Sequence, residues 1–155
     1  MVKKNEMMLL SYLRKNARET LTKISRETRM PVSTIFDKLK KYDNNLIKKA
    51  TILLDFPKLG YNTRVTMMLK VAKEHRNDLK EHLMKENRVN SFYRVNNNFD
   101  FILEGIFINM QEFQEFVEKL EDKFKIEEKE MYYVLDDIKK EEFMANPRAL
   151  ALAMA

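Results

Sequence analysis

Residues 61–140 alternate between strand-like and helix-like hydrophobic patterns, and this alternation restricts the possible folds more than any other feature. In residues 65–71 every second side chain is buried-type (Val, Met, Leu, Val), which predicts a half-buried strand. The pattern then predicts a helix, two strands joined as a hairpin, a second helix and a last strand, at 75–86, 91–95, 100–108, 109–123 and 131–135. The order β-α-β-β-α-β is that of a ferredoxin-like domain, an antiparallel sheet with both helices on one face.

A sheet covered by helices on one face leaves its other face open, and this favours pairing with a second copy of the chain. We therefore predict an α+β protein that forms at least a homodimer. The predicted domain limits are 1–60 for a first domain with its linker, 61–140 for the ferredoxin-like dimerisation domain, and 141–155 for a tail. The tail is simple in composition, so the sequence suggests a frayed helix or a vector remnant without a function.

Residues 1–60 predict three short helices followed by an extended wing. Thr20 offers an N-cap oxygen for the second helix, and Pro31 suits the first turn of the third. In the third helix Ile35, Leu39 and Tyr42 recur at helical spacing and form the predicted buried stripe. Two helices joined by a tight turn, with a β-prone segment after them, predict a winged helix-turn-helix.

The outer side of the third predicted helix carries the residues expected to contact DNA. Residues 1–50 hold 13 Lys and Arg against 5 Asp and Glu, whereas residues 51–155 hold 16 against 19. A basic segment joined to a mildly acidic one indicates a polyanionic partner for the first part, most simply DNA. Hydroxyls and lysines can bind base edges and phosphates, so we predict contacts from Ser33, Thr34, Asp37, Lys38 and Lys41.

Further cations flank this helix, and each has a plain alternative role. Arg18, Lys48 and Lys49 are candidate phosphate contacts, or they are charges that only keep the surface soluble. Phe36 either touches a thymine methyl group or packs between helices, and the sequence favours packing.

Several classes of site and location are disfavoured by composition. The chain has no cysteine, which excludes disulfides and thiolate chemistry, and only two histidines. His75 and His82 lack a third ligand nearby in sequence, so we predict surface histidines, no metal site and no cofactor. No apolar run is long enough for a membrane span and no signal peptide is recognised, so a cytoplasmic location is expected.

Over about residues 5–140 the chain resembles the leucine-responsive and asparagine regulators, the Lrp/AsnC family of transcription factors. The family's first helix is similar to residues 9–18 (LLSYLRKNAR), and its recognition helix to residues 33–43 (STIFDKLKKYD). Its linker pattern Leu-Asp-x-x-x-Leu-Gly appears in residues 54–60 (LDFPKLG). The resemblance implies a regulator that binds double-stranded DNA, forms dimers or octamers, and responds to an amino acid or another small molecule.

The chain departs from this family at the hairpin turn before the third sheet strand. The family's Thr-Gly-x-x-Asp-like motif, associated with effector binding, is replaced by Asn96-Asn97-Asn98-Phe99-Asp100. Asparagine tolerates positive φ, but the Asn97 side chain occupies space that glycine leaves free. The segment is therefore either an effector site formed by Asn96, Asn97, Asn98 and Asp100, or a hairpin turn in which Asp100 accepts backbone hydrogen bonds.

The predicted function is that of a DNA-binding transcriptional regulator, not an enzyme. One alternative is a chromatin protein that coats DNA with little sequence preference, which would bind cognate and random DNA alike. A second is an enzyme, because siroheme decarboxylases share the Lrp-like architecture. Those enzymes look different around the hairpin, where they use histidines, and this chain has none after His82.

Overall fold

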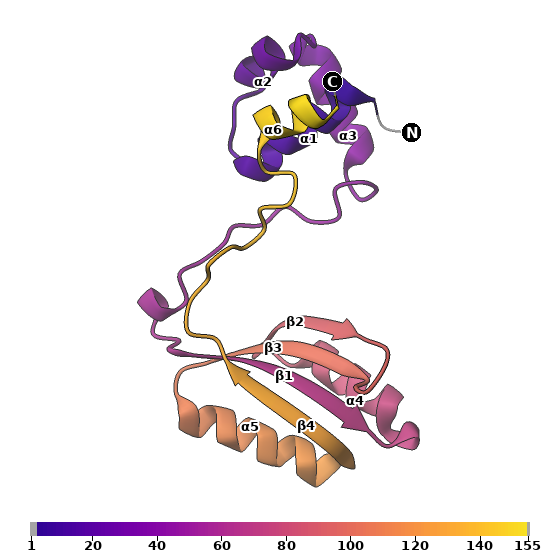
Figure 1. Ribbon diagram of the computed structural model, residues 1–155, viewed down its shortest axis with the longest axis vertical. Helices are drawn as coiled ribbons and strands as arrows, with labels where there is room; N and C mark the ends of the chain where they lie inside the picture. The colour runs from indigo at the N-terminus through magenta and orange to yellow at the C-terminus, as the bar shows by residue number, and fades with distance from the viewer. Residues whose placement is uncertain (1–2, 155) are drawn as a thin grey trace. The chain divides into compact units, whose positions relative to one another are not determined.

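The computed structural model describes residues 3–154, and the chain divides into two compact units (Figure 1). The helical unit contains the chain up to Leu53 together with the chain from Ile138 onward. The sheet unit contains Leu54–Asp137. The helical unit is thus built from both ends of the chain.

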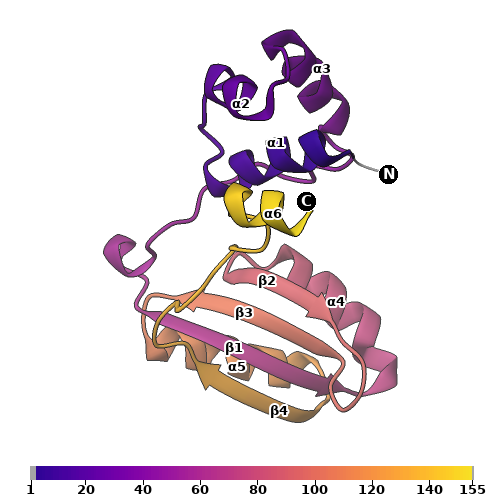
Figure 2. The same cartoon turned by 45° about the horizontal axis from the view of Figure 1, so that its top comes forward.

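The sheet unit has the predicted α+β architecture. Its elements are β1 (Thr63–Val71), α4 (Arg76–Lys85), β2 (Val89–Arg94), β3 (Phe101–Phe107), α5 (Met110–Lys123) and β4 (Ile126–Tyr133), with short 3₁₀ helices at Pro57–Leu59 and Lys73–His75. The four strands pair in the order β2-β3-β1-β4, and every pair is antiparallel. Figure 2 shows both helices on the same face of this sheet, which confirms the ferredoxin-like prediction.

The core of the sheet unit lies between the sheet and its two helices. The alternate side chains of β1 point into it, and Val65, Met67, Leu69 and Val71 are at most 1% exposed. The helices cover them with apolar stripes at helical spacing, from Leu79 and Leu83 on α4 and from Phe113, Phe116, Val117 and Leu120 on α5. Each fully buried side chain of this size stabilises the fold by about 1.5–3 kcal/mol.

The opposite face of the sheet has no cover within the sheet unit, Leu54–Asp137. Met68 on β1 lies opposite Ile102 on β3, and Ile102 lies opposite Tyr93 on β2. Tyr93 and Tyr132 are 60% and 54% exposed. This open sheet face, defined by Met68, Tyr93, Ile102 and Tyr132, therefore carries apolar and aromatic side chains, with Thr66, Glu104 and Glu130 among them on the same face.

The last strand begins earlier than the sequence predicts. The predicted strand was 131–135, whereas β4 runs over Ile126–Tyr133 and pairs with β1 along this length. Its first half reads Glu-Glu-Lys-Glu after Ile126, a composition that lowers strand propensity. Because β4 is an edge strand, these charged side chains stay in solvent while the backbone still pairs.

Gly105 on β3 faces the core beside an aromatic cluster. A Cβ at this position would lie 2.6 Å from Cε2 of Phe107. The Phe107 ring is fully buried and packs at 5.2 Å between ring centroids on both Phe113 and Phe116, so it has no room to turn away.

We therefore expect Gly105→Ala to lower the free energy of unfolding by about 1–3 kcal/mol, through overpacking. Urea unfolding followed by far-ultraviolet circular dichroism measures this loss. Because Phe107→Leu shortens the obstructing side chain, the double variant Gly105→Ala/Phe107→Leu should be more stable than the sum of the two single losses predicts. Strict additivity of the two losses would show that the contact does not matter.

The helical unit contains α1 (Lys4–Lys15), α2 (Leu21–Thr28), α3 (Val32–Tyr42) and α6 (Pro147–Ala153). Thr20 caps α2 as predicted, its side chain accepting the Lys23 backbone N–H at 3.3 Å. Arg29 ends α2 in the left-handed conformation with φ of 56°, and Pro31 is the N-cap of α3. The turn between the two helices is therefore only a few residues long, as the sequence predicts.

The expected wing has no strand. Residues 48–55 lack regular secondary structure, and the only pairing nearby is an isolated bridge between Asp43 and Ile47. Ile52 and Leu53 are 64% and 60% exposed. The β-propensity of this segment is real, but a strand also needs a partner for its backbone hydrogen bonds, and the described chain supplies none there.

The expectation of a frayed helix at the C-terminus is wrong, because α6 packs on α1 (Figures 1 and 2). Ser11 of α1 is completely buried, and its hydroxyl donates to the backbone oxygen of Met144 at 2.6 Å. Arg14 donates to the backbone oxygen of Phe143 and pairs with Glu141 at 2.8 Å. Residues 141–154, the α1-packing tail, are thus an integral part of the helical unit.

Candidate nucleic-acid interface

The exposed side of α3 is the best candidate for binding a polyanion. Ile35 is fully buried against Leu9 and Ile24, which fixes the rotation of α3 about its own axis. The residues that then face solvent are Val32, Ser33, Phe36, Asp37, Lys40 and Lys41. They form two rows in which successive residues are four apart, Val32, Phe36 and Lys40 in one and Ser33, Asp37 and Lys41 in the other, so they lie on one side of the helix. We call this set the α3 outer face.

The α3 outer face differs from the predicted one by a rotation toward Phe36 and Lys40. Thr34 and Lys38, which the sequence assigned to the outer side, are only half-exposed. Phe36 is 60% exposed, so the expectation that it packs between helices is wrong. Lys40 was not predicted as a site residue at all. The signal for it was available, since Lys40 lies four residues after Phe36 and seven after Ser33.

Lys38 is held by an ion pair at the junction of α1 and α3. Its ammonium group donates to a carboxylate oxygen of Glu6 on α1, and its side chain is only 28% exposed. The hydrogen bond from Lys38, followed by that from the Lys3 backbone, lowers the pKa of Glu6 from 4.5 to about 2. The same hydrogen bond raises the pKa of Lys38. Thr34, Asp37 and Lys41 line a hollow of about 310 Å³ beside this pair.

Because of this ion pair, we expect the helical unit to lose stability as the pH becomes acidic. Because the folded-state pKa of Glu6 lies below its unfolded value, the stabilisation is complete above pH 4.5 and is lost as the pH falls toward 2. We expect a carboxyl NMR titration to show Glu6 protonating near pH 2. Glu6→Gln should unfold at lower urea concentration than the parent chain at pH 7, with the difference shrinking below pH 4.5. A Glu6 titration midpoint near 4.5 would contradict the ion pair.

The remaining predicted cations all lie in the helical unit and are exposed. Arg18 precedes α2, and its backbone N–H donates to the side-chain oxygen of Asn16 at 3.0 Å. Lys48 and Lys49 follow Ile47 in the irregular segment. The helical unit holds 16 Lys and Arg against 7 Asp and Glu, whereas the sheet unit holds 13 against 17. The positive charge is therefore concentrated in the unit that presents α3.

The second predicted site, Asn96 to Asp100, belongs to the sheet unit and forms the turn between β2 and β3. Asn97 adopts φ of 80°, as the turn requires. Asp100 is anchored by the rest of the unit: its carboxylate accepts the Val71 backbone N–H at 2.9 Å and pairs with Arg76 at 2.9 Å. These two partners, on β1 and α4, were not apparent from sequence because they are distant from Asp100 along the chain.

The asparagines of this turn remain at the surface. Asn96, Asn97 and Asn98 are exposed, and the Asn98 amide donates to Glu128 of β4 at 3.3 Å. The turn thus presents amide groups around a carboxylate that is already hydrogen-bonded. The turn belongs to the sheet unit, whereas the α3 outer face belongs to the helical unit.

Two further observations concern other kinds of site. His75 and His82 are half-buried, and both imidazole rings contact the ring of Phe124. The distance between ring centroids is 6.3 Å for His75 and 5.4 Å for His82. Within residues 3–154, no three histidine, aspartate or glutamate side chains gather closely enough to hold a metal ion. None of the helices in that range combines the length and apolar character needed to cross a bilayer.

Comparison with known families matches residues 64–143 to the Lrp/AsnC ligand-binding domain. An uncharacterised HTH-type transcriptional regulator of Pyrococcus horikoshii is 26% identical over 140 residues, which cover 90% of this chain and 94% of the relative. The HTH-type transcriptional regulator FL11 of Pyrococcus furiosus is 24% identical over 111 residues, which cover 71% of this chain and 74% of the relative.

Solved structures share the fold. A transcriptional regulator of Neisseria meningitidis in complex with L-Met superposes with a TM-score of 0.82 at 22% identity, covering 90% of this chain and 94% of that one. AsnC of Escherichia coli superposes with a TM-score of 0.78 at 16% identity, covering 90% of this chain and 96% of that one. At these identities the likeness establishes the fold alone.

Proposed function

The chain belongs to the Lrp/AsnC family, and from this premise we propose that it is a transcriptional regulator that binds double-stranded DNA through α3. The observation that carries the proposal is the α3 outer face, a hydroxyl, an aromatic ring and two lysines turned to solvent on the helix after a tight turn. This arrangement suits the second helix of a helix-turn-helix, which enters the major groove.

Each side chain of the α3 outer face has a chemistry that fits the groove. Ser33 lies in the first turn of α3, where backbone N–H groups favour a phosphate. Phe36 offers an apolar contact for the methyl group of thymine, and the Asp37 carboxylate can accept from the amino group of cytosine. Lys40 and Lys41 reach phosphates or guanine edges.

The other predicted residues take supporting roles in the proposal. Arg18, Lys48 and Lys49 contact phosphates and position the unit without reading sequence. Thr34 borders the hollow beside Lys38 and Glu6. The main role of Lys38 is to hold α3 against α1 through its ion pair with Glu6, because its ammonium group already has a carboxylate partner.

We propose that the open sheet face is covered by a second copy of the chain. The apolar and aromatic side chains on it, with Tyr93 60% and Tyr132 54% exposed, are of the kind enriched in protein interfaces. A dimer would present two α3 helices to half-sites about 34 Å apart on a palindromic operator.

The proposed effector is an amino acid, and the proposed place is the turn of residues 96–100. Support comes from the Neisseria meningitidis relative in complex with L-Met and from the exposed asparagines of this turn. Asn97→Gly preserves the positive φ and removes a side chain, so we propose tighter binding in this variant. Isothermal titration with a panel of amino acids tests the assignment. If neither the parent chain nor the Asn97→Gly variant gives a heat of binding with any amino acid, the assignment is refuted.

The proposed function is tested by fluorescence anisotropy of the purified chain with the DNA upstream of its own gene and with scrambled DNA, at two salt concentrations. A regulator binds the native region more tightly, and its affinity falls with salt as counterions are released. Equal affinity for both DNAs would favour the chromatin protein instead. Failure to bind either DNA would refute the assignment of α3.

A further inference from the structure

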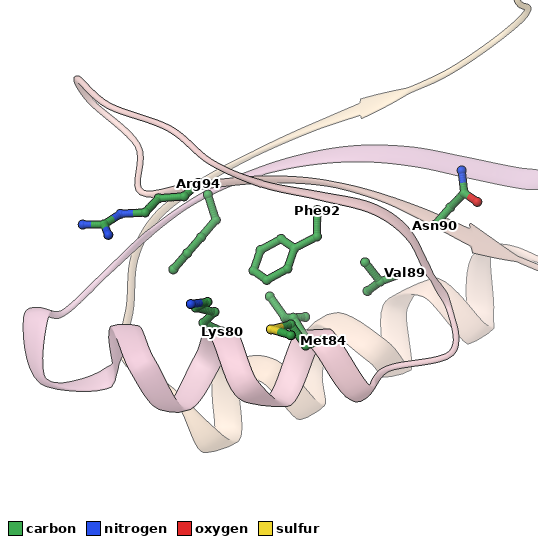
Figure 3. A pocket seen from close by; sticks show the side chains of 8 residues that line it. Lys80, Met84, Val89, Asn90, Phe92 and Arg94 are labelled. Atoms are coloured by element: carbon green, nitrogen blue, oxygen red, sulfur yellow. The ribbon is translucent and has the colours of Figure 1, made fainter. Parts of the chain in front are cut away.

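A hollow of about 380 Å³ lies between α4 and the edge strand β2 of the sheet unit, and its lining shares no residue with the turn of residues 96–100. It is lined by Lys80, Leu83, Met84, Val89, Asn90, Phe92, Arg94 and Phe101. Figure 3 shows the Phe92 ring directed from β2 toward α4, with Lys80 and Arg94 toward one end and Asn90 toward the other. This volume falls in the range of small-molecule sites.

The floor and one rim of the hollow are apolar. Leu83 and Phe101 are 1% and 4% exposed, and the Phe92 ring packs against Phe101 at 5.2 Å between centroids. Met84 lies at the rim with 69% of its surface exposed. A flexible, solvent-exposed methionine beside the buried ring of Phe101 and the half-buried ring of Phe92 can fold over an apolar ligand.

The charge at one end of the hollow is positive and uncompensated. Lys80 on α4 and Arg94 on β2 are both exposed, and across residues 3–154 the structure records neither an ion pair nor a side-chain hydrogen bond for either. Within the described residues, some other cations of the same unit have carboxylate partners (Lys58, Arg64, Lys70, Arg76, Arg88 and Lys129) and others have none (Lys73, Lys85, Lys119, Lys123 and Lys125). The lining contains no aspartate or glutamate.

We propose that this hollow binds a small monocarboxylate with an apolar body. Lys80 and Arg94 would take the carboxylate, and the body would lie on Phe92, Phe101 and Met84. An amino acid is a poorer ligand, because its ammonium group would face two cations and no acid. The inference goes beyond the proposed function and does not depend on DNA binding.

Three ligands with the same phenyl body separate the contributions of charge. We expect 3-phenylpropanoate to bind the full-length chain at one site per chain in isothermal titration without DNA. L-phenylalanine, which adds an ammonium group, should bind about tenfold more weakly, the effect of a loss near 1.4 kcal/mol. 3-Phenylpropan-1-amine, which has no carboxylate, should not bind measurably. Equal binding of all three ligands would overturn the proposal.

Two double variants test whether 3-phenylpropanoate binds in the hollow between α4 and β2. Lys80→Gln/Arg94→Gln should weaken 3-phenylpropanoate at least about tenfold, as expected for lost charge-assisted hydrogen bonds. Lys119→Gln/Lys123→Gln removes the same charge from exposed positions on α5 and should leave the affinity unchanged. Amide shifts in ¹H–¹⁵N spectra should concentrate on α4 and β2. Undiminished binding by the first variant, or shifts confined to the turn of residues 96–100, would refute this site.

Discussion

Deletion of residues 141–155 is expected to lower the free energy of unfolding of the helical unit by about 3 kcal/mol, the order for re-exposing one or two buried side chains. The deletion uncovers Ser11, which is completely buried, and removes Ala145, which is 7% exposed. It also removes the acceptors of Ser11 and Arg14. Urea unfolding followed by the helical circular dichroism signal measures the loss, and DNA binding should weaken with it.

A matched pair of point variants, one at a buried and one at an exposed position of the tail, tests whether the stability comes from the packing of buried side chains. Ala145→Glu places a carboxylate in a buried position and should reproduce most of the loss. Ala149→Glu makes the same chemical change at an exposed position of α6 and should leave the unfolding midpoint unaltered. If the truncated chain unfolds at the same urea concentration as the full chain, the tail contributes nothing to stability.

Reversal of two charges on α3 should cause the second large effect. We expect Lys40→Glu/Lys41→Glu to weaken DNA binding by about 100-fold or more, because each lysine contact to DNA contributes about 1–3 kcal/mol and the new carboxylates repel phosphate. Both side chains are exposed, so the fold should survive the change. Anisotropy titration at low and moderate salt measures the loss and should also show a smaller salt dependence.

Two controls make this result specific. Lys119→Glu/Lys123→Glu changes the net charge equally but lies on α5 of the sheet unit, and its DNA affinity should fall far less. Lys38→Met removes the partner of Glu6, so we expect it to affect stability more than the affinity of the folded chain. If the α5 variant loses as much affinity as the α3 variant, overall charge and not α3 determines binding.

The sheet unit was largely predictable because its information is local. Alternation in residues 65–71 places Val65 and Leu69 on one face, and helical spacing places Phe113 and Val117 together. Such periodicities depend only on backbone geometry. The same holds for the cap at Thr20 and the helix start after Pro31, which involve neighbours within a few residues. The limits of β4 were wrong because an edge strand tolerates charges that propensity disfavours.

Local sequence patterns were therefore enough to predict the order of helices and strands, the faces that they bury, and the unequal distribution of charge. Long-range packing was needed to show that Lys38 pairs with Glu6, that Phe36 faces solvent, that Asp100 is held by Val71 and Arg76, and that the tail packs on Ser11. Each of these depends on a partner distant along the chain or on the rotation of a helix against its neighbours. Periodicity shows that a helix has an apolar side, but packing decides which boundary residues are covered.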